Sequence, residues 1–406
     1  MKDERWPSLP LSEWADTYAT LHRWTQIVGK TRLAFTPLVN HWWNAPLYIS
    51  ARGLTTSLIH EADFAFEVEF DFLKHVLEIR TSKSQIVQLP LRPQSVAEFY
   101  AEYMAVLKAL GIDAAIYPVP VEIEDATPFA EDHTHASYDP DYANRVWRIL
   151  VESSRVFEQF RARFVGKSSP THFFWGSFDL ALTRFSGRRA PEWSGAAPHV
   201  AAWVMKEGYS HELISAGFWP GAKGIIEEPV FYSYAYPEPA GFAEATVDPA
   251  SARYDATMKE FFLPYEAVRT APSPDAMLLD FLQTTYEAGA TLGNWDRAAL
   301  ERIPAETPSS ATPVSEIEIV DIPEKRRFEA VVDGRTAFVD YRRRGDTIFL
   351  THTEVPPALE GRGIGSALAR YSLDYARANS LKVVPICPFI ASYMRENPEY
   401  SDLVRD

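Results

Sequence analysis

Three glycines within five residues, Gly361, Gly363 and Gly365, constrain the C-terminal part of this chain more than any other feature. An alternating run at residues 347–355 precedes them and predicts a β-strand, and apolar residues at helical spacing predict a helix over residues 366–379. A turn without side chains lets several backbone N–H groups point in one direction, where the start of a helix adds partial positive charge. This strand–turn–helix unit suits a pyrophosphate, although glycines at this spacing also serve tight turns that hold no ligand.

The C-terminal region, residues 328–404, resembles the minimal members of the GNAT (Gcn5-related) N-acetyltransferase superfamily. The resemblance runs through residues 351–356, 360–365, 384–389 and 397–400. It implies a small mixed sheet with flanking helices, acetyl-CoA as co-substrate, and an amine on a small molecule or a protein as acceptor. In the superfamily the turn begins with Arg or Gln, whereas this chain has Glu360, and Arg362 is the alternative source of positive charge.

The same resemblance implies which residues hold acetyl-CoA. Backbone N–H groups on the strand, at Thr353 and Val355, are expected to polarise the thioester carbonyl. The residues expected at the pyrophosphate form the turn and the start of the helix: Glu360, Gly361, Arg362, Gly363, Ile364, Gly365 and Ser366.

Three side chains are candidates for catalysis. His352 and Glu354 share one face of the predicted strand, because side chains alternate along it, and both are acid–base groups. Cys387 follows a second predicted strand, residues 381–386, and opens the last helix, where the resemblance makes it a candidate acceptor of the acetyl group. Each has a structural alternative, an exposed strand residue for His352 and Glu354 and a small buried apolar side chain for Cys387. Direct attack by the amine and a route through an acetyl-cysteine both stay open.

The whole chain has 406 residues, which is long enough for two or three domains. A stretch of Pro, Ser and Thr at residues 302–315 predicts a linker. It divides a domain at residues 1–301 from the acetyltransferase-like domain at residues 316–406. We therefore expect the α+β class, with a large mixed α+β domain followed by a small GNAT-type domain.

Composition excludes several classes of function. A net charge of −15 argues against non-specific binding of nucleic acid, which needs a basic surface. A single cysteine excludes internal disulfides and cysteine-rich zinc sites, and it fits a reducing cytoplasm. No apolar run is long enough to cross a bilayer, and the charged N-terminus lacks a signal-peptide core. We expect a cytoplasmic protein that binds neither nucleic acid nor membrane; its oligomeric state stays open.

Helices and strands alternate along the N-terminal domain. Helices are predicted at residues 12–29, 95–110, 139–164 and 273–290, and strands at residues 47–49, 64–72, 76–79 and 86–91. The run at residues 115–123 predicts an edge strand, because Pro118 and Pro120 cannot donate to a ladder.

This N-terminal half, residues 5–301, resembles a family known only as a domain of unknown function. The resemblance rests on residues 40–44, 51–57, 171–179, 209–212, 217–221 and 232–238. It implies no reaction. Histidines beside aromatic clusters nevertheless indicate a pocket with a few polar groups, as small-molecule sites have. The candidates are His41, Trp42, Arg52, His172, Trp175, Asp179, His211 and Glu212. Since no spacing typical of a metal site occurs, no metal is expected, and each histidine has a structural alternative.

Three functional hypotheses follow. The first is an acetyl-CoA-dependent N-acetyltransferase fused to a domain of unknown activity. Glu360 motivates a second, a CoA-binding sensor without catalysis. The histidine–aromatic clusters motivate a third, in which the N-terminal domain is an enzyme or ligand-binding module regulated by the acetyltransferase-like domain.

Overall fold

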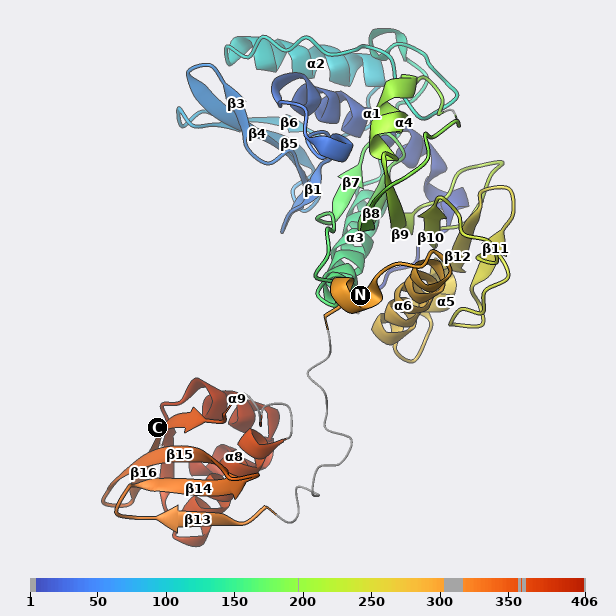
Figure 1. The fold of residues 1–406 in the computed structure, drawn as a ribbon. Coiled ribbons are helices and arrows are strands. Elements are labelled where there is room, and N and C mark those ends of the chain that lie inside the picture. Colours follow the sequence, from blue (N-terminus) through green and yellow to red (C-terminus); the bar gives the residue numbers. More distant parts are fainter. Residues whose placement is uncertain (1–4, 196, 303–316, 357–358, 360–362, 405–406) are drawn as a thin grey trace. The chain divides into compact units, whose positions relative to one another are not determined.

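The chain forms two compact units, Met1–Arg302 and Ile303–Asp406 (Figure 1). The computed structural model describes residues 5–195, 197–302, 317–356, 359 and 363–404. Residues 303–315 of the predicted linker lie outside this range. Both units mix helices with sheets, which confirms the α+β class.

The N-terminal unit contains two antiparallel sheets and helices that cover them. Its helices are α1 (Leu11–Phe35), α2 (Val96–Ala109), α3 (Pro140–Arg161), α4 (Ala202–Gly208), α5 (Tyr265–Arg269), α6 (Pro274–Leu292) and α7 (Arg297–Leu300), with short 3-10 helices η1 (Asn40–Trp42) and η2 (Phe129–Glu131). Its strands are β1 (Tyr48–Ile49), β2 (Gly53–Thr55), β3 (Ile59–Glu61), β4 (Phe64–Asp71), β5 (Val76–Thr81), β6 (Ile86–Pro90), β7 (His172–Phe174), β8 (Asp179–Arg189), β9 (His211–Trp219), β10 (Val230–Tyr236), β11 (Arg253–Asp255) and β12 (Glu260–Pro264).

The two sheets meet at their edges. The first has the order β1-β2-β4-β5-β6, with β3 also paired to β4, and the second has the order β11-β12-β10-β9-β8-β7. Leu47, just before β1, exchanges two backbone hydrogen bonds with Phe173 on β7, at 2.9 and 3.0 Å. These bonds join the sheets into one unit.

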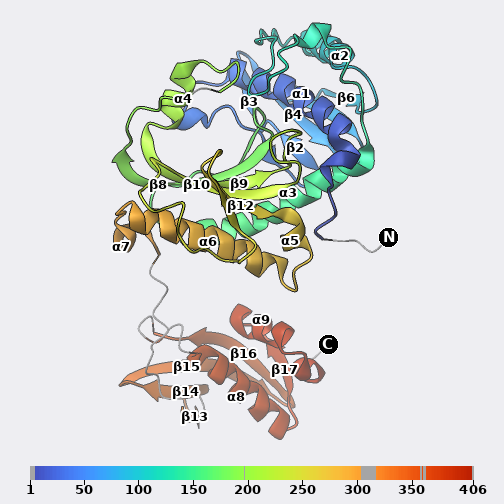
Figure 2. The same cartoon turned by 90° about the vertical axis from the view of Figure 1, so that its right-hand side faces the viewer.

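The second sheet has one face in the core and one face toward a cavity. Leu180 and Leu182 of β8 lie in the core, on the side where α3 and α6 pack. Side chains alternate along a strand, so Asp179, Ala181 and Thr183 point to the other face. Figure 2 shows α6 on one side of this sheet and α4 on the other.

The predicted helix starts are confirmed where the caps are clear. Ser95 and Glu98 form a reciprocal capping box at the start of α2. The Asp139 side chain accepts the N–H groups of Asp141 and Tyr142 at the start of α3. Both caps satisfy donors that the helix itself cannot pair, which is why these starts could be predicted.

Two expectations about the N-terminal unit are wrong. The run at residues 115–123 is irregular and not an edge strand. Instead of joining a ladder, Val121 pairs its N–H and C=O groups with the side chain of Gln26. Helix α1 continues past Gly29 to Phe35, because Thr31 and Arg32 are buried and bonded within the fold.

Among its described residues, the C-terminal unit has a five-stranded sheet and two α-helices. Its elements are β13 (Ile319–Ile322), β14 (Arg327–Val332), β15 (Arg335–Arg344), β16 (Thr347–Glu354), α8 (Ile364–Ala378), β17 (Lys382–Pro385), α9 (Pro388–Glu396) and the 3-10 helix η5 (Pro398–Leu403). The strands follow chain order and are antiparallel except for the last pair, β16 and β17. Helix α8 is the crossover between these parallel strands and lies against the sheet (Figure 2). Its residues Leu368, Leu373 and Ala376 are buried in the core of this unit.

Candidate functional site

The first N–H groups of α8 have no partner within the helix itself. Gly363 precedes the helix with a left-handed backbone, φ +73°, which glycine adopts without strain. The first bond of the helix runs from the N–H of Ala367 to the carbonyl of Gly363, at 2.9 Å. The N–H groups of Ile364, Gly365 and Ser366 therefore precede the helical ladder and can bind an anion. This terminus fits the pyrophosphate of acetyl-CoA; Glu360, Gly361 and Arg362 lie outside the described residues.

Strands β16 and β17 pair along only part of β16. Their parallel pairing ends at Leu350 and Pro385, whereas β16 continues to Glu354. The carbonyl of Leu350 accepts the N–H of Cys387 at 2.9 Å, so backbone groups of Leu350 face β17. The β15–β16 register shifts between Asp340 and Tyr341, so the alternation of Leu350 does not continue to His352 and Glu354, which pair with Asp340 and Phe338 of β15. The backbone of Thr353, between them, faces the open edge.

Cys387 lies at this opening. It is 5% exposed, immediately precedes α9, and its Sγ lies 3.4 Å from the Oγ1 of Thr353. A Cβ on Gly365 would lie 3.7 Å from Val355 and 3.1 Å from Phe389, the second residue of α9. The start of α8, the end of β16 and the start of α9 thus converge.

His352 and Glu354 are not brought together with the thiol. Their side chains are 58% and 59% exposed, and Nε2 of His352 lies 3.6 Å from Oε2 of Glu354. They lie opposite Asp340 and Phe338 of β15 on the exposed face of the sheet, whereas Thr353 lies opposite buried Val339 and contacts Cys387.

The N-terminal unit contains a cavity of about 550 Å³. It lies over the exposed face of β8, β9 and β10, and α4, the end of α1 and η1 complete its wall. Four of the predicted residues line it: His41, Trp42, Trp175 and Asp179. These four residues therefore lie together in the wall of one cavity.

The other predicted pocket residues lie elsewhere. Arg52 pairs with Asp71 on the first sheet. His172 is 1% exposed between Tyr48 and Trp43, and burial lowers its pKa to about 3.

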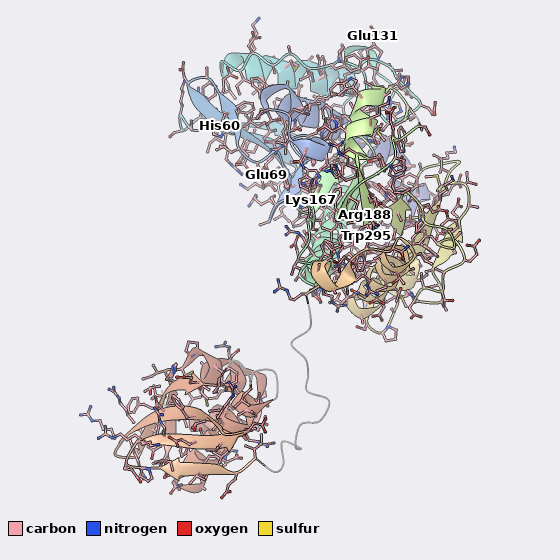
Figure 3. The ribbon with its side chains drawn as sticks, viewed as in Figure 1. His60, Glu69, Glu131, Lys167, Arg188 and Trp295 are labelled. Atoms are coloured by element: carbon pink, nitrogen blue, oxygen red, sulfur yellow. The ribbon has the colours of Figure 1, made fainter. Side chains whose placement is uncertain are left out.

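The last two predicted pocket residues, His211 and Glu212, do not line the cavity. His211 contacts the ring of His41 behind the wall, at 5.5 Å between centroids. Glu212 accepts from Arg188, which also bonds the carbonyls of Gly293 and Asn294 close to Trp295 (Figure 3).

Neither unit offers a metal site within the described residues, since no three His, Cys, Asp or Glu side chains converge there. Among the same residues, none of the helices combines the length and apolar character that a membrane crossing requires.

Comparison with known proteins supports this two-part organisation. Residues 6–302 match the family of unknown function DUF5996. The chain belongs to this family. Residues 327–403 match the GCN5-related N-acetyl-transferase family, so the C-terminal unit is a GNAT-type domain.

Several named relatives match a short part of this chain. Protein NATD1 of Xenopus tropicalis is 36% identical over 92 residues, which cover 22% of this chain and 84% of the relative. Protein NATD1 of Mus musculus is 35% identical over 97 residues, or 23% of this chain and 88% of the relative. The human protein is 47% identical over 49 residues, or 12% and 43%.

In the DUF5996 domain, polar side chains form rows across the cavity floor. Tyr232 on β10 reaches over β9 and donates its hydroxyl to Asp179 on β8. Gly217 permits this, because a Cβ there would lie 2.4 Å from the Tyr232 hydroxyl and 2.2 Å from the carbonyl of Leu180.

A second row lies one step along the sheet. Thr183 and Ser215 are cross-strand partners whose hydroxyls lie 2.9 Å apart, and Tyr234 lies opposite Ser215 on β10. The hydroxyl of Tyr234 is 3.0 Å from that of Tyr209, which follows α4. The floor is therefore bonded to the segment that covers it.

Sequence reasoning missed several residues of this site: Lys30, Glu122, Ser177, Tyr209, Tyr232 and Tyr234. The alternation of tyrosines at residues 232–236 was a usable signal for one sheet face. Lys30 was missed because the predicted helix ended at Gly29. Glu122 had no local signal, since its segment reads as a strand.

Proposed function

We propose that the C-terminal domain is an acetyl-CoA-dependent N-acetyltransferase that acts on an amine. The observation that carries the proposal is the opening between β16 and β17, with Cys387 3.4 Å from Thr353 at its mouth. The match to the acetyltransferase family supports it independently.

The open N–H groups of Ile364, Gly365 and Ser366 hold the pyrophosphate of acetyl-CoA. The N–H groups of Thr353 and Val355, at the free end of β16, polarise the thioester carbonyl and stabilise the negative charge that develops on its oxygen. Both sets lie in or next to regular elements, so their positions are fixed before the substrate arrives.

Cys387 takes up the acetyl group in this proposal. Its sulfur forms a bond to the carbonyl carbon, the bond to the CoA sulfur breaks, and the thiol proton passes to the leaving CoA thiolate. The acceptor amine then attacks the acetyl-cysteine and restores the thiol. Thr353 orients the sulfur through the hydroxyl contact.

The amine must lose a proton before or during its attack, since a lysine-type amine has a pKa of about 10.4. We assign this proton to the exposed pair of His352 and Glu354. The pair lies at the free end of β16, where an amine substrate can approach.

Release of CoA thiol tests this function. The full chain is incubated with acetyl-CoA and a panel of primary amines, and release is expected to depend on the amine. Cys387→Ala should abolish turnover. Retention of full turnover in this variant rules out the cysteine route and leaves direct attack.

Calorimetric titration with acetyl-CoA tests the placement of the cofactor. Gly365→Val should abolish binding and Gly365→Ala should weaken it less, because a side chain there enters the space between Val355 and Phe389. Unchanged binding in both variants contradicts the placement. Binding without transfer to any amine supports the sensor hypothesis instead.

A further inference from the structure

Two carboxylates mark one end of the N-terminal cavity. Asp179 is 7% exposed and accepts hydrogen bonds from Ser177 and Tyr232, which fix its position at the start of β8. Glu122 also lines the cavity. A Cβ on Gly176 would lie 2.1 Å from its Oε1, so this carboxylate lies against the backbone beside Ser177.

The backbone holds Glu122 in an unfavourable conformation. Its φ is +60°, in the left-handed region that non-glycine residues rarely adopt. Neighbouring bonds enforce it: the N–H of Glu122 donates to the carbonyl of Pro198 at 2.8 Å, and Val121 is paired with Gln26. The lining residues His41, Trp42 and His199 have positive φ as well. Such strain concentrates at ligand sites, where the surrounding fold maintains it.

The rest of the wall is rich in aromatic rings and already accommodates a cation. Lys30 is 5% exposed, and its ammonium lies 5.0 Å from the ring centre of Tyr117 and 5.6 Å from that of Trp175. Trp175 is fixed by its bond to the carbonyl of Ala45, at 2.8 Å. Ring faces attract positive charge, so this wall favours ammonium groups.

We propose that the cavity is a binding site for a small organic amine, with its ammonium group between Glu122 and Asp179 and its apolar body against the rings. Two carboxylates face one built-in cation, Lys30, so an anionic ligand would meet more repulsion than a cationic one. The volume of about 550 Å³ accommodates a ring with a short side chain.

The pKa shifts of Glu122 and Lys30 agree with a site that binds a cation. The pKa of Glu122 is raised to about 7, first by burial and then by the charge of Asp179. Glu122 is exposed by its accessible area, and its carboxylate belongs to the cavity wall. Burial lowers the pKa of Lys30 to about 8, against the opposing effect of Glu122. A bound ammonium would favour ionised Glu122 and relieve its repulsion with Asp179.

Tryptophan fluorescence of the full chain tests the proposal. All eleven tryptophans lie between Trp6 and Trp295, so the signal reports on the N-terminal unit and not on the acetyltransferase domain. The probes share a phenyl ring and differ in charge: 2-phenylethylamine, 2-phenylethanol and 3-phenylpropanoate. We expect the amine to bind about tenfold more tightly than the alcohol and the carboxylate to bind most weakly.

Variants of the charged cavity residues test whether the amine binds in the cavity. Glu122→Gln should weaken the amine about tenfold and leave the alcohol unchanged, whereas Lys30→Met should tighten the amine by removing a competing cation. Glu124→Gln, an exposed residue of the same segment, is the control and should change nothing. The proposal is overturned if the amine and alcohol bind equally, if the carboxylate binds best, or if none of the probes changes the fluorescence.

Discussion

The hydroxyl of Tyr232 on β10 donates to the carboxylate of Asp179 on β8, across the intervening strand β9 at Gly217. A tyrosine, a glycine and an aspartate that are far apart in sequence thus form one cross-sheet arrangement. Its geometry leaves no room for a side chain at residue 217.

Gly217→Ala is therefore expected to destabilise the N-terminal unit by about 1–3 kcal/mol, because the new methyl group displaces the Tyr232 ring and meets the Leu180 carbonyl. Urea unfolding followed by tryptophan fluorescence measures this cost. Gly208→Ala is the control, since a Cβ there meets nothing within 4 Å. Equal stability of the two variants would contradict the packing described.

Gln26 should be critical although it touches no proposed ligand. It is fully buried and pairs with both backbone groups of Val121, at 2.8 Å each. Gln26→Ala leaves these groups unpaired, which we expect to cost about 1–3 kcal/mol and to weaken amine binding by releasing Glu122. Gln159→Ala, on an exposed position of α3, is the matched control for unfolding and for binding. Normal amine binding in Gln26→Ala would show that Glu122 is positioned by other contacts.

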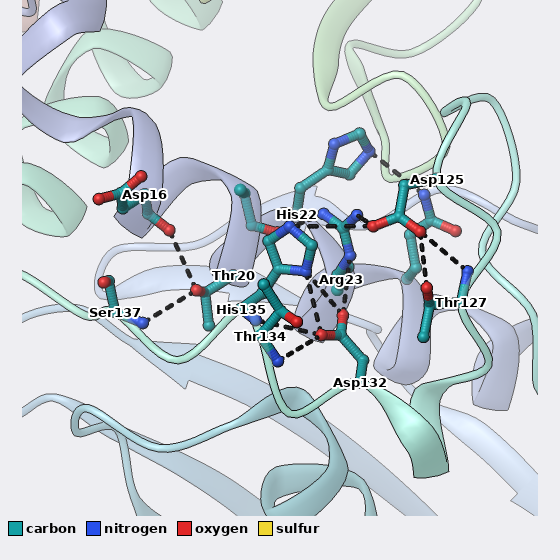
Figure 4. Close-up of polar contacts among 12 residues, drawn as sticks. Asp16, Thr20, His22, Arg23, Asp125, Thr127, Asp132, Thr134, His135 and Ser137 are labelled. Atoms are coloured by element: carbon teal, nitrogen blue, oxygen red, sulfur yellow. Dashed lines mark hydrogen bonds and ion pairs between the residues drawn. The ribbon is translucent and has the colours of Figure 1, made fainter.

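A buried ion pair attaches Asp132, which follows η2, to α1 (Figure 4). The Nε of Arg23 lies 3.1 Å from Asp132, with the two side chains 6% and 1% exposed, and His135 also approaches Asp132 at 2.8 Å. Asp132→Asn removes the buried partner and leaves Arg23 paired with Asp125, whose side chain is 48% exposed, so it should cost about 1.5–3 kcal/mol of unfolding free energy. Asp141→Asn breaks an exposed pair with Arg145 and should cost less than about 1 kcal/mol. Similar costs for the two variants would refute a buried role for Arg23.

The pH dependence of stability should reveal Glu122. Its folded pKa, about 7, exceeds the ordinary value of 4.5, so between these values the folded state binds more protons than the unfolded state. Stability from this group is present at low pH and is lost as pH rises through 7.

Other groups near Glu122 also titrate. The effect of Glu122 is therefore measured as the difference in unfolding free energy between the wild type and a variant without this carboxylate. Asp179 and Lys30 face the same carboxylate, and buried His22, with a pKa lowered to about 4, has the opposite dependence. Unfolding free energies of wild type and Glu122→Gln are compared from pH 4.5 to 7. The wild type should lose stability relative to the variant as pH rises, and a constant difference would be inconsistent with a raised pKa.

The features that could be predicted from the sequence are those that depend on neighbouring residues, such as helix caps and strand alternation. Ser95 and Asp139 mark helix starts because their side chains cap them, and the alternation at residues 347–355 marks β16. Aromatic clusters led to His41, Trp42 and Trp175 in the cavity wall. These signals are confined to a few neighbouring residues.

The missed residues depend on distant partners. Glu122 faces the cavity because Gln26, on a helix far earlier in the chain, holds the preceding residue. Arg52 was expected in the pocket and instead pairs with Asp71 within its own sheet. No pattern within either segment encodes these pairings.

Intact mass spectrometry after mixing with acetyl-CoA tests the central claim most directly, that Cys387 meets the acetyl group at the opening between β16 and β17. Since Cys387 is the single cysteine, a hydroxylamine-sensitive acetyl adduct can form on no other thiol. The account predicts one such adduct on the wild-type chain, its loss on addition of an acceptor amine, and its absence from Cys387→Ala. An unmodified wild-type chain, or an equal adduct on the alanine variant, would contradict it.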